Sequence, residues 1–388
     1  MKKGLIFMPC EIVSGVLMLS FLLMTAVSCG KKESDLDKMV QVEDGVTIVR
    51  NPMEPVKVPG GPTRLVLEKN LRIGIAEGDE NYMFAEVRAV QVDDDDNIYV
   101  LDSKLINIKV YDKDGRYIRM FLKTGQGPEE VGWPARMYMR DGNIIIILDS
   151  NNRKYLEFSP EGECLKEINL GDKGYIFRSW PDSIGNIYCE TMDITPEMSV
   201  LKIVKYDSAF TQAEELASLE IKRTPRETLT DRPRLICSVR TDDQVMWANS
   251  TEYCLHVLDS SGKLVKQIYK DYKPLPYTAE EINRVKKEYE DQGFPSTLKL
   301  VFPKVHPAIN YLINDDRGRT YVRTNNKNDE GHMKWDVFDE EGRYILSFYH
   351  QENEYIFVIK EDRVYTICLE DEEGIPHMTR YTMNWQND

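Results

Sequence analysis

Basic side chains in this sequence are too few to balance the acidic ones. Of 388 residues, 50 are Lys or Arg and 65 are Asp or Glu, which gives a formal net charge of −15 at pH 7. An excess of negative charge repels phosphate backbones, so nucleic acid is not expected as a partner. The same charge opposes docking onto anionic lipid, and any attachment to a membrane therefore requires an apolar anchor.

Local motifs of catalysis are also missing. The histidines form no HxH or HExxH pattern, and no GxSxG turn or glycine-rich phosphate loop is present. The segment from Gly125 to Pro128 indicates a tight turn, because Pro128 lacks the amide that a phosphate cradle would use. The acidic run from Asp93 to Asp96 lacks the spaced ligands of a calcium loop and is expected to be a solvated turn. We therefore assign no catalytic residue, metal or cofactor from the sequence.

Cysteine is scarce, with seven in the chain. Two of them lie in the N-terminal segment, and the other five lack the spacing of a zinc knuckle or a CxxC pair; these are Cys164, Cys189, Cys237, Cys254 and Cys368. Most of the five lie in apolar, strand-like runs, where a buried thiol behaves as a small hydrophobic residue. A disulfide between two of them is an alternative in an oxidising compartment.

The N-terminus carries the features of a signal peptide. Two lysines precede an apolar run from Ile12 to Val27, which is too short to span a membrane comfortably. The run ends in AVSC, with small residues before Cys29, and this resembles a bacterial lipobox. We predict that residues 1–28 are removed and that Cys29 is lipidated; the alternative is an ordinary secretory signal with a chance cysteine. Gly30, in place of an acidic residue, is compatible with delivery to the outer membrane, on either its periplasmic or its surface side.

After a flexible tether predicted over residues 29–45, a two-part unit of strand-like runs and turns recurs along the chain. Its first copy reads DNIYVLD and then VYDKDGRYIRMF, and the copies begin at Asp96, Gly142, Gly185, Asp243, Gly318 and Asp362. The spacings of 46, 43, 58, 75 and 44 residues include the length of a four-stranded propeller blade. Because one twisted sheet cannot cover both of its faces, such units stack around an axis. The predicted fold is an all-β six-bladed β-propeller over residues 46–388.

Two segments do not repeat. The sixth unit stops one strand short, and we predict that an early strand near residues 63–74 completes it and closes the ring. The longest spacing contains helical periodicity, with a capping-box pattern at Thr278 and Glu281 and a terminating Gly293. We predict an inserted helix near residues 278–292, on the face where the central channel opens. It is expected either to cover the mouth as a lid or to pack on the rim.

The repeat also carries a family resemblance. The pattern V-D-x-D-x-N-I-Y-V, followed by Y-D-x-D-G-x-Y and by GQGPEEV at Gly125–Val131, resembles NHL-type six-bladed propellers. Over about residues 60–388 the chain is similar, more narrowly, to six-bladed β-propeller lipoproteins of Bacteroidota. The resemblance implies the fold and leaves the function open, because such propellers serve many roles.

A basic residue opens the first strand of several units: Arg88, Arg136, Arg178 and Arg234, with His306 as a looser fifth member. First strands line the central channel of a propeller, so these side chains would form a partial cationic ring inside an acidic protein. Guanidinium groups suit bidentate contact with carboxylate or sulfate. We hypothesise that the ring, with Trp180 beside it, binds an anionic group of a ligand. The alternative is that each arginine pairs with an acidic residue of a neighbouring blade.

These observations predict a cell-envelope lipoprotein, held at the membrane through Cys29, that binds a small anionic ligand, a glycan or a protein partner at its channel mouth. One alternative is a metal-dependent lactonase- or lyase-like propeller enzyme, and another is a structural scaffold of an envelope complex. A polar, arginine-lined cavity favours binding, converging metal ligands favour the enzyme, and an apolar plug favours the scaffold.

Overall fold

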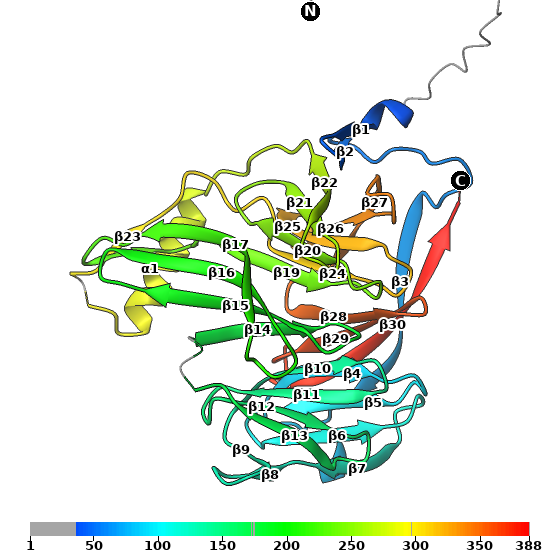
Figure 1. Cartoon of the computed structure of the whole chain (residues 1–388), viewed down its shortest axis with the longest axis vertical. Helices are drawn as coiled ribbons and strands as arrows, with labels where there is room; N and C mark the ends of the chain where they lie inside the picture. Colours follow the sequence, from blue (N-terminus) through cyan, green and yellow to red (C-terminus); the bar gives the residue numbers. More distant parts are fainter. Residues whose placement is uncertain (1–35, 172, 174, 296, 388) are drawn as a thin grey trace, which may run out of the picture.

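The structure analysed is a computed structural model, which describes residues 36–387 apart from residues 172, 174 and 296 (Figure 1). The predicted signal peptide and Cys29 lie outside the described residues. Within the described part of the chain, no helix has the length and apolar character needed to cross a membrane.

Six blades, each of four antiparallel strands, form the body of the protein, and five of them are built from consecutive strands. The first blade contains β4 (Val87–Val92), β5 (Ile98–Asp102), β6 (Asn107–Tyr111) and β7 (Tyr117–Phe121). The second contains β10 (Pro134–Arg140), β11 (Ile144–Asp149), β12 (Lys154–Phe158) and β13 (Cys164–Asn169). The third contains β14 (Tyr175–Pro181), β15 (Ile187–Ile194), β16 (Met198–Tyr206) and β17 (Ala213–Lys222).

The other three blades follow the same order. The fourth contains β19 (Leu235–Val239), β20 (Val245–Asn249), β21 (Cys254–Leu258) and β22 (Leu264–Lys270). The fifth contains β24 (Tyr311–Asn314), β25 (Thr320–Lys327), β26 (Met333–Phe338) and β27 (Tyr344–His350). The sixth contains β28 (Glu354–Lys360), β29 (Arg363–Cys368), β30 (His377–Gln386) and, from the other end of the chain, β3 (Arg64–Ile73).

The first strands of the six blades form a closed ring. Each contacts the first strand of the next blade, in the order β4, β10, β14, β19, β24 and β28, and β28 contacts β4 again. The predicted six-bladed β-propeller is therefore confirmed.

Residues from the two ends of the chain close this ring, as predicted. Strand β3 pairs antiparallel with β30, from Arg64 opposite Gln386 to Ile73 opposite Met378, and Figure 1 shows the blue strand beside the red one. Gly74 follows directly with a φ of +143°, and a Cβ atom there would lie 2.4 Å from the Cβ of His377. Only glycine allows the chain to leave β3 so close to the start of β30.

The strands next to the first ones are buried on both faces, which explains their continuous apolar runs. In β5, Ile98 belongs to a cluster with Tyr365 of the sixth blade, whereas Tyr99 belongs to a cluster with Ile145 of the second blade. Alternate side chains of one strand thus pack against the two neighbouring blades. Each blade depends on the blade at either side for the burial of its apolar surface.

An N-terminal hairpin extends the fourth blade. Strands β1 (Val40–Glu43) and β2 (Val46–Asn51) follow a short 3₁₀ helix, η1 (Asp37–Met39), and β2 pairs parallel with β22. The Asn51 side chain donates to the Gly342 carbonyl at 2.9 Å and accepts from the Tyr344 amide at 2.7 Å. The predicted tether over residues 29–45 therefore ends in regular structure, because β1 pairs with a strand that is fastened to the fourth and fifth blades.

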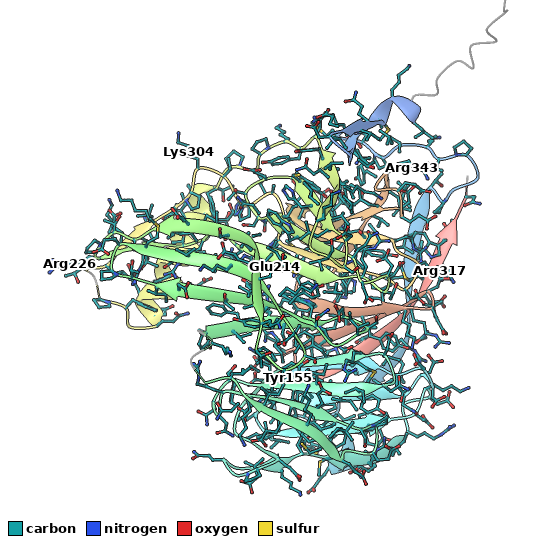
Figure 2. The ribbon with its side chains drawn as sticks, in the orientation of Figure 1. Tyr155, Glu214, Arg226, Lys304, Arg317 and Arg343 are labelled. Carbon is teal, nitrogen blue, oxygen red and sulfur yellow. The ribbon has the colours of Figure 1, made fainter. Side chains whose placement is uncertain are left out.

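The predicted inserted helix is confirmed as α1 (Ala279–Asp291), which begins with the capping box of Thr278 and Glu281. None of its residues is buried. After it, β23 (Lys299–Val301) pairs parallel with β18 (Glu227–Leu229), which precedes the fourth blade. These elements and the long strands of the third blade project to one side, with Arg226 near the tip (Figure 2). The remaining short elements are η2 (Glu80–Tyr82), β8 (Lys123–Thr124) and β9 (Glu130–Val131).

Closure of the ring by β3 leads to a stability prediction. Leu65 of β3 is 6% exposed and belongs to a cluster with Tyr381, Met383 and residues of the fifth blade. We expect Leu65→Ala to lower the free energy of unfolding by about 2–5 kcal/mol, because it leaves a cavity at the closing seam. Denaturant titration of the purified protein measures this change. Val42→Ala, on the exposed strand β1, is the control and should change stability little; equal effects of the two substitutions would contradict the role of β3.

Candidate functional site

Two cavities follow one another along the inner strands. The first, of about 750 Å³, opens at the beginnings of the first strands and is called here the mouth cavity. The second, of about 540 Å³, follows those strands further and is called the inner cavity. Arg88, Arg136, Arg178 and Arg234 line both. The four arginines singled out in the sequence therefore lie together where the cavities meet.

Irregular strand pairing positions these arginines. In β4 the register with β5 shifts between Val87 and Ala89, so Arg88 itself is the extra residue of a β-bulge. Similar shifts directly precede Arg136 in β10 and Arg178 in β14. A bulge bends the strand and redirects a side chain. The same irregularity in three blades turns the arginines towards the channel.

The segments that enter the first strands are held by residues at or just after the ends of the second strands. The Asp102 carboxylate accepts from the amides of Ala85 and Glu86, at 2.7 and 3.3 Å. The Asp149 carboxylate accepts from Gly132 and Trp133, at 2.7 and 2.9 Å. In the fourth blade, the Ser250 hydroxyl accepts from the amide of Arg234 at 2.9 Å. The final aspartate of the YVLD and IILD runs thus fixes the backbone that precedes Arg88 and Arg136.

Only two of the four arginines form an ion pair with a carboxylate of the described residues. Arg88 lies 3.7 Å from a Glu86 carboxylate oxygen, and Arg178 lies 3.6 Å from one of Glu190, each within its own blade. Arg136 donates to the Ala135 carbonyl at 2.8 Å, and no carboxylate of the described residues forms an ion pair with it.

Arg234 also forms no ion pair within the described residues, and it donates to the Asn310 side-chain oxygen at 3.0 Å. The alternative, in which each arginine pairs with an acid of the next blade, is therefore wrong for this ring.

A fifth arginine, Arg323, was missed by the sequence analysis. It lines the inner cavity, is 8% exposed, and donates to the Glu352 carbonyl at 3.2 Å, while its Nε has no partner. Arg323 lies on β25, the second strand of its blade, opposite Tyr311 of β24. Its signal in the sequence is a charged residue inside the apolar run TYVRT, on a second strand and not on a first one.

Mutual repulsion is evident in the ring. Burial lowers the pKa of Arg136, and the nearby Arg178 and Arg88 lower it further. Burial likewise lowers the pKa of Arg234, with a contribution from Arg178, and that of Arg323, with a contribution from Arg234. Arginine stays charged at neutral pH, so the five guanidinium groups produce a region of positive potential inside an acidic protein.

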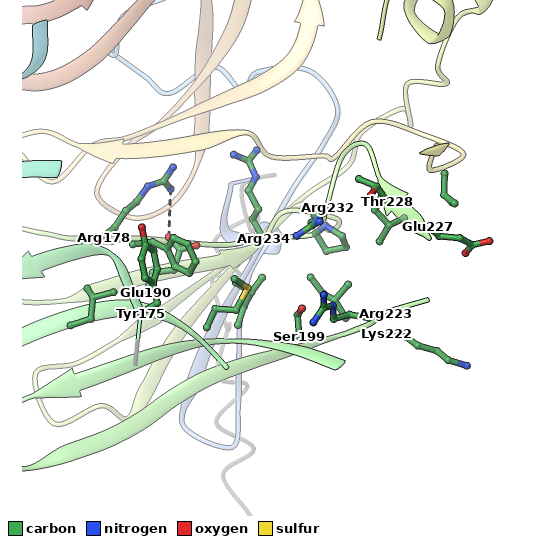
Figure 3. Close-up of a pocket in the computed structure, with 18 of the residues that line it drawn as sticks. Tyr175, Arg178, Glu190, Ser199, Lys222, Arg223, Glu227, Thr228, Arg232 and Arg234 are labelled. Carbon is green, nitrogen blue, oxygen red and sulfur yellow. Dashed lines mark ion pairs between the residues drawn. The ribbon is translucent and has the colours of Figure 1, made fainter. Parts of the chain in front are cut away.

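One buried carboxylate faces this positive region. Glu190 of β15 is the register partner of Arg178, is 6% exposed, and lines the mouth cavity. Its Oε2 atom is buried without a hydrogen bond. Burial raises the pKa of Glu190, although Arg178, Arg234 and Arg136 oppose that rise. Figure 3 shows the Arg178 and Arg234 side chains extending to the same side, with the ion pair to Glu190 dashed.

The rim of the mouth cavity adds further basic and aromatic side chains. The basic ones are Lys222, Arg223, Arg226 and Arg232. Trp133 and Tyr175 line the same cavity and are 40% and 52% exposed. Apart from Glu190, the acidic residue of this lining is Glu227, which pairs with Lys299 at 2.7 Å. The rim therefore extends the positive surface outwards and offers two exposed aromatic side chains.

The remaining predicted site residues divide between the channel and the rim. Trp180 lines the inner cavity. His306 lies outside both cavities: its ring stacks on Tyr277 with centroids 3.7 Å apart, and its Nε2 is 3.4 Å from a Glu281 carboxylate oxygen. Because the insertion runs from β22 to β24, His306 fastens the base of α1 instead of opening a first strand.

The helix does not act as a lid in this structure. No residue of α1 lines the mouth or the inner cavity, whereas Leu229 of β18 and Val301 of β23 line the mouth cavity. The paired strands β18 and β23 thus form a side wall, and α1 packs outside it. The rim alternative for the helix is the one observed.

Other sequence motifs have structural roles. The loop from Gly125 to Pro128 is a turn in which Lys154 donates to the Gly127 carbonyl at 2.6 Å. Asp94 and Asp95 form an exposed turn, as expected, whereas Asp93 is 3% exposed and accepts from the Asn97 amide at 2.8 Å, so it caps that turn from the interior. The five cysteines beyond the N-terminal segment are free thiols. Among the described residues, no cluster of three or more His, Cys, Asp or Glu side chains could hold a metal ion.

Comparison with known proteins supports the fold. A family model described as a 6-bladed beta-propeller matches residues 77–224. The chain is a six-bladed β-propeller. No curated protein matches it.

Two solved structures from Bacteroides align over nearly their full lengths. A protein described as exported, from Bacteroides fragilis, has a TM-score of 0.52 at 13% identity, over 87% of this chain and 99% of that one. A member of the duf4221 family from Bacteroides vulgatus has a TM-score of 0.50 at 11% identity, over 84% and 99%. At these identities the likeness shows the fold alone.

The environment of Glu190 leads to a stability prediction. Because burial raises its folded pKa above the ordinary 4.5, ionised Glu190 destabilises the native state as the pH rises through that raised value. We expect Glu190→Gln to melt at a higher temperature than the unsubstituted protein at pH 7. The difference should shrink towards zero below the ordinary pKa, where the carboxyl is protonated in both states. Calorimetric melting between pH 4 and 8 measures it.

The matched control is Glu227→Gln, because pairing with Lys299 lowers the pKa of Glu227. This control should bring no gain in melting temperature at pH 7. A Glu190→Gln protein that melts lower than the unsubstituted one at pH 7 would show that the carboxylate is a stabilising partner of Arg178.

Proposed function

We propose that this protein is a cell-envelope lipoprotein that takes a small anionic ligand or an acidic glycan into its arginine-lined channel. The observation that carries the proposal is the convergence of arginines from five blades, Arg88, Arg136, Arg178, Arg234 and Arg323, around two connected cavities. An acidic protein gains nothing in stability from burying like charges together, so their proximity favours a role in binding.

The chemistry of the ring suits carboxylate or sulfate. Arg136 and Arg234 form their hydrogen bonds to carbonyl or amide oxygens and keep their net charge unpaired within the described residues. A planar guanidinium group can donate two parallel bonds to such an anion. Cavities of about 750 and 540 Å³ fall in the range of small-molecule sites.

The two alternatives fit the channel less well. A metal-dependent lactonase or lyase requires converging oxygen and nitrogen ligands for a cation, whereas the charged side chains of this lining are mainly arginines, and its carboxylates are Glu190 and Glu227. A structural scaffold is expected to fill its axis with apolar side chains, whereas two arginine-lined cavities lie along the inner strands here. A positive, hollow channel supports anion binding.

The envelope location rests on the N-terminal sequence. The apolar run to Val27 and the AVSC motif support export and lipidation at Cys29, and a structurally similar Bacteroides protein is described as exported. A lipid anchor would compensate for the negative charge that opposes docking onto anionic membranes. The outer membrane is the proposed destination.

Binding by the ring can be tested directly. We expect calorimetric titration to detect at least one of sulfate, citrate and glucuronate, with an affinity that falls as ionic strength rises. Arg136→Ala and Arg234→Ala should each weaken that binding by about 10- to 100-fold, because each removes a charge-assisted hydrogen-bond donor. Arg116→Ala, whose side chain is 74% exposed on the outer hairpin of the first blade, is the matched control. If none of the three anions binds, or the control weakens binding equally, the proposal is wrong.

Lipidation can be tested separately. When the full chain is expressed in a Gram-negative host, we expect incorporation of labelled palmitate and recovery in the membrane fraction. Cys29→Ser should abolish both, because the acyl chains are attached to the cysteine sulfur and, after cleavage, to the new N-terminus. Cys10→Ser, within the predicted signal peptide, is the control and should retain both. Membrane recovery of the Cys29→Ser protein would contradict the anchor.

A further inference from the structure

Glu190 is the acidic side chain that lies deepest in the mouth cavity. Its Oε2 atom is buried and has no hydrogen-bond partner, although the Arg178 guanidinium is only 3.6 Å away. That distance is too long for a hydrogen bond, so the two groups form an ion pair that is not hydrogen-bonded. The carboxylate therefore keeps an acceptor site that the described residues do not use.

Burying a hydrogen-bond acceptor without a donor costs free energy, and at Glu190 the neighbouring arginines do not remove that cost. Figure 3 shows Arg178 joined to Glu190 by the dashed ion pair, at a distance too long for a hydrogen bond, whereas Arg234 donates to Asn310 instead. Burial raises the pKa of Glu190 despite three neighbouring arginines, so these arginines do not fully compensate for its desolvation. Because Glu190 lines the mouth cavity, a ligand bound there can supply the missing donor once the carboxylate turns towards it.

We propose that the ligand is an acidic sugar, whose anionic group binds Arg136 and Arg234 and whose neighbouring hydroxyl donates a hydrogen bond to Glu190. This inference rests on the proposed function and specifies its ligand class. The donor is a neutral hydroxyl, because an ammonium group would be repelled by the five arginines of the channel. Glu190 is thus a specificity-determining residue that distinguishes hydroxylated anions from plain ones.

The rim supports a sugar ring over other hydroxy acids. Trp133 and Tyr175 line the same cavity with exposed aromatic rings, on which the apolar face of a sugar can stack. Lys222 and Arg223 lie further out along the lining and can contact a second anionic group of a longer chain. The shared chemistry is a sugar ring that carries either a carboxylate or a sulfate.

The experiment compares four probes of similar size: galacturonate, galactose 6-sulfate, neutral galactose, and cyclohexanecarboxylate, which has the anion without hydroxyls. We expect the unsubstituted protein to bind galacturonate or the sulfate at least about tenfold more tightly than both galactose and cyclohexanecarboxylate. The stronger of the two acidic sugars identifies the anionic group. Titration calorimetry at pH 7 and constant ionic strength supplies all four affinities.

Substitution of Glu190 then distinguishes a hydrogen bond between Glu190 and the sugar from simple charge repulsion between Glu190 and the anion. Glu190→Ala should weaken binding of the preferred acidic sugar by about tenfold or more, because the acceptor of its hydroxyl is lost. The affinity for cyclohexanecarboxylate should stay unchanged or rise, because a negative charge has been removed. Glu190→Gln keeps one acceptor oxygen, so its affinity for the acidic sugar should lie between those of the unsubstituted protein and Glu190→Ala. Glu288→Ala, at an exposed position of α1 that lines neither cavity, is the control and should preserve the preference.

The possible failures are distinct. If the unsubstituted protein binds cyclohexanecarboxylate as tightly as the acidic sugars, the anion site stands and the role of Glu190 is wrong. If Glu190→Ala weakens or strengthens all anions equally, Glu190 is a structural or repulsive group and the inference is also wrong. If none of the four probes binds while sulfate or citrate does, the sugar is wrong and the arginine ring remains. If no anion binds, both proposals fail.

Discussion

Closure of the ring by β3 and β30 is the constraint on which the rest of this structure depends. A twisted four-stranded sheet leaves two apolar faces uncovered, and here alternate side chains of strands such as β5 are buried by the blades on either side. That arrangement is stable only if no blade is left at an end. By supplying the outermost strand of the sixth blade from residues near the N-terminus, the chain makes every blade an interior one.

The same ring concentrates positive charge in an acidic protein. First strands converge on the axis, so residues that occupy equivalent positions in separate repeats meet although they are far apart in the chain. Arg88, Arg136 and Arg178 reach the channel through β-bulges, and the backbone that precedes two of them is held by amides that donate to Asp102 and Asp149. The negatively charged exterior maintains solubility, whereas the positively charged interior of the channel attracts anions.

Several groups in the channel lower the stability of the folded protein. Arg136 and Arg234 are buried close to other cations, and Glu190 is a buried carboxylate with an unused acceptor atom. Such groups persist because the surrounding blades fix the backbone on which they stand. An arrangement that opposes folding and is complementary to an absent partner is the usual signature of a binding site.

Periodic features of the chain determined the fold and part of the site. The repeated turn-and-strand runs predicted six blades, the orphan strand predicted the closure, and the capping box at Thr278 predicted α1, because each depends on interactions between residues close in sequence or equivalent in the repeat. Four arginines were found for the same reason. Only the tertiary structure decided that Arg323 and Glu190, which lie on second strands, face the channel, that His306 fastens the insertion, and that the end of the tether joins the fourth blade. Whether a side chain reaches the axis depends on strand register, on bulges and on the neighbouring blade, and these are set by contacts between residues distant in the chain.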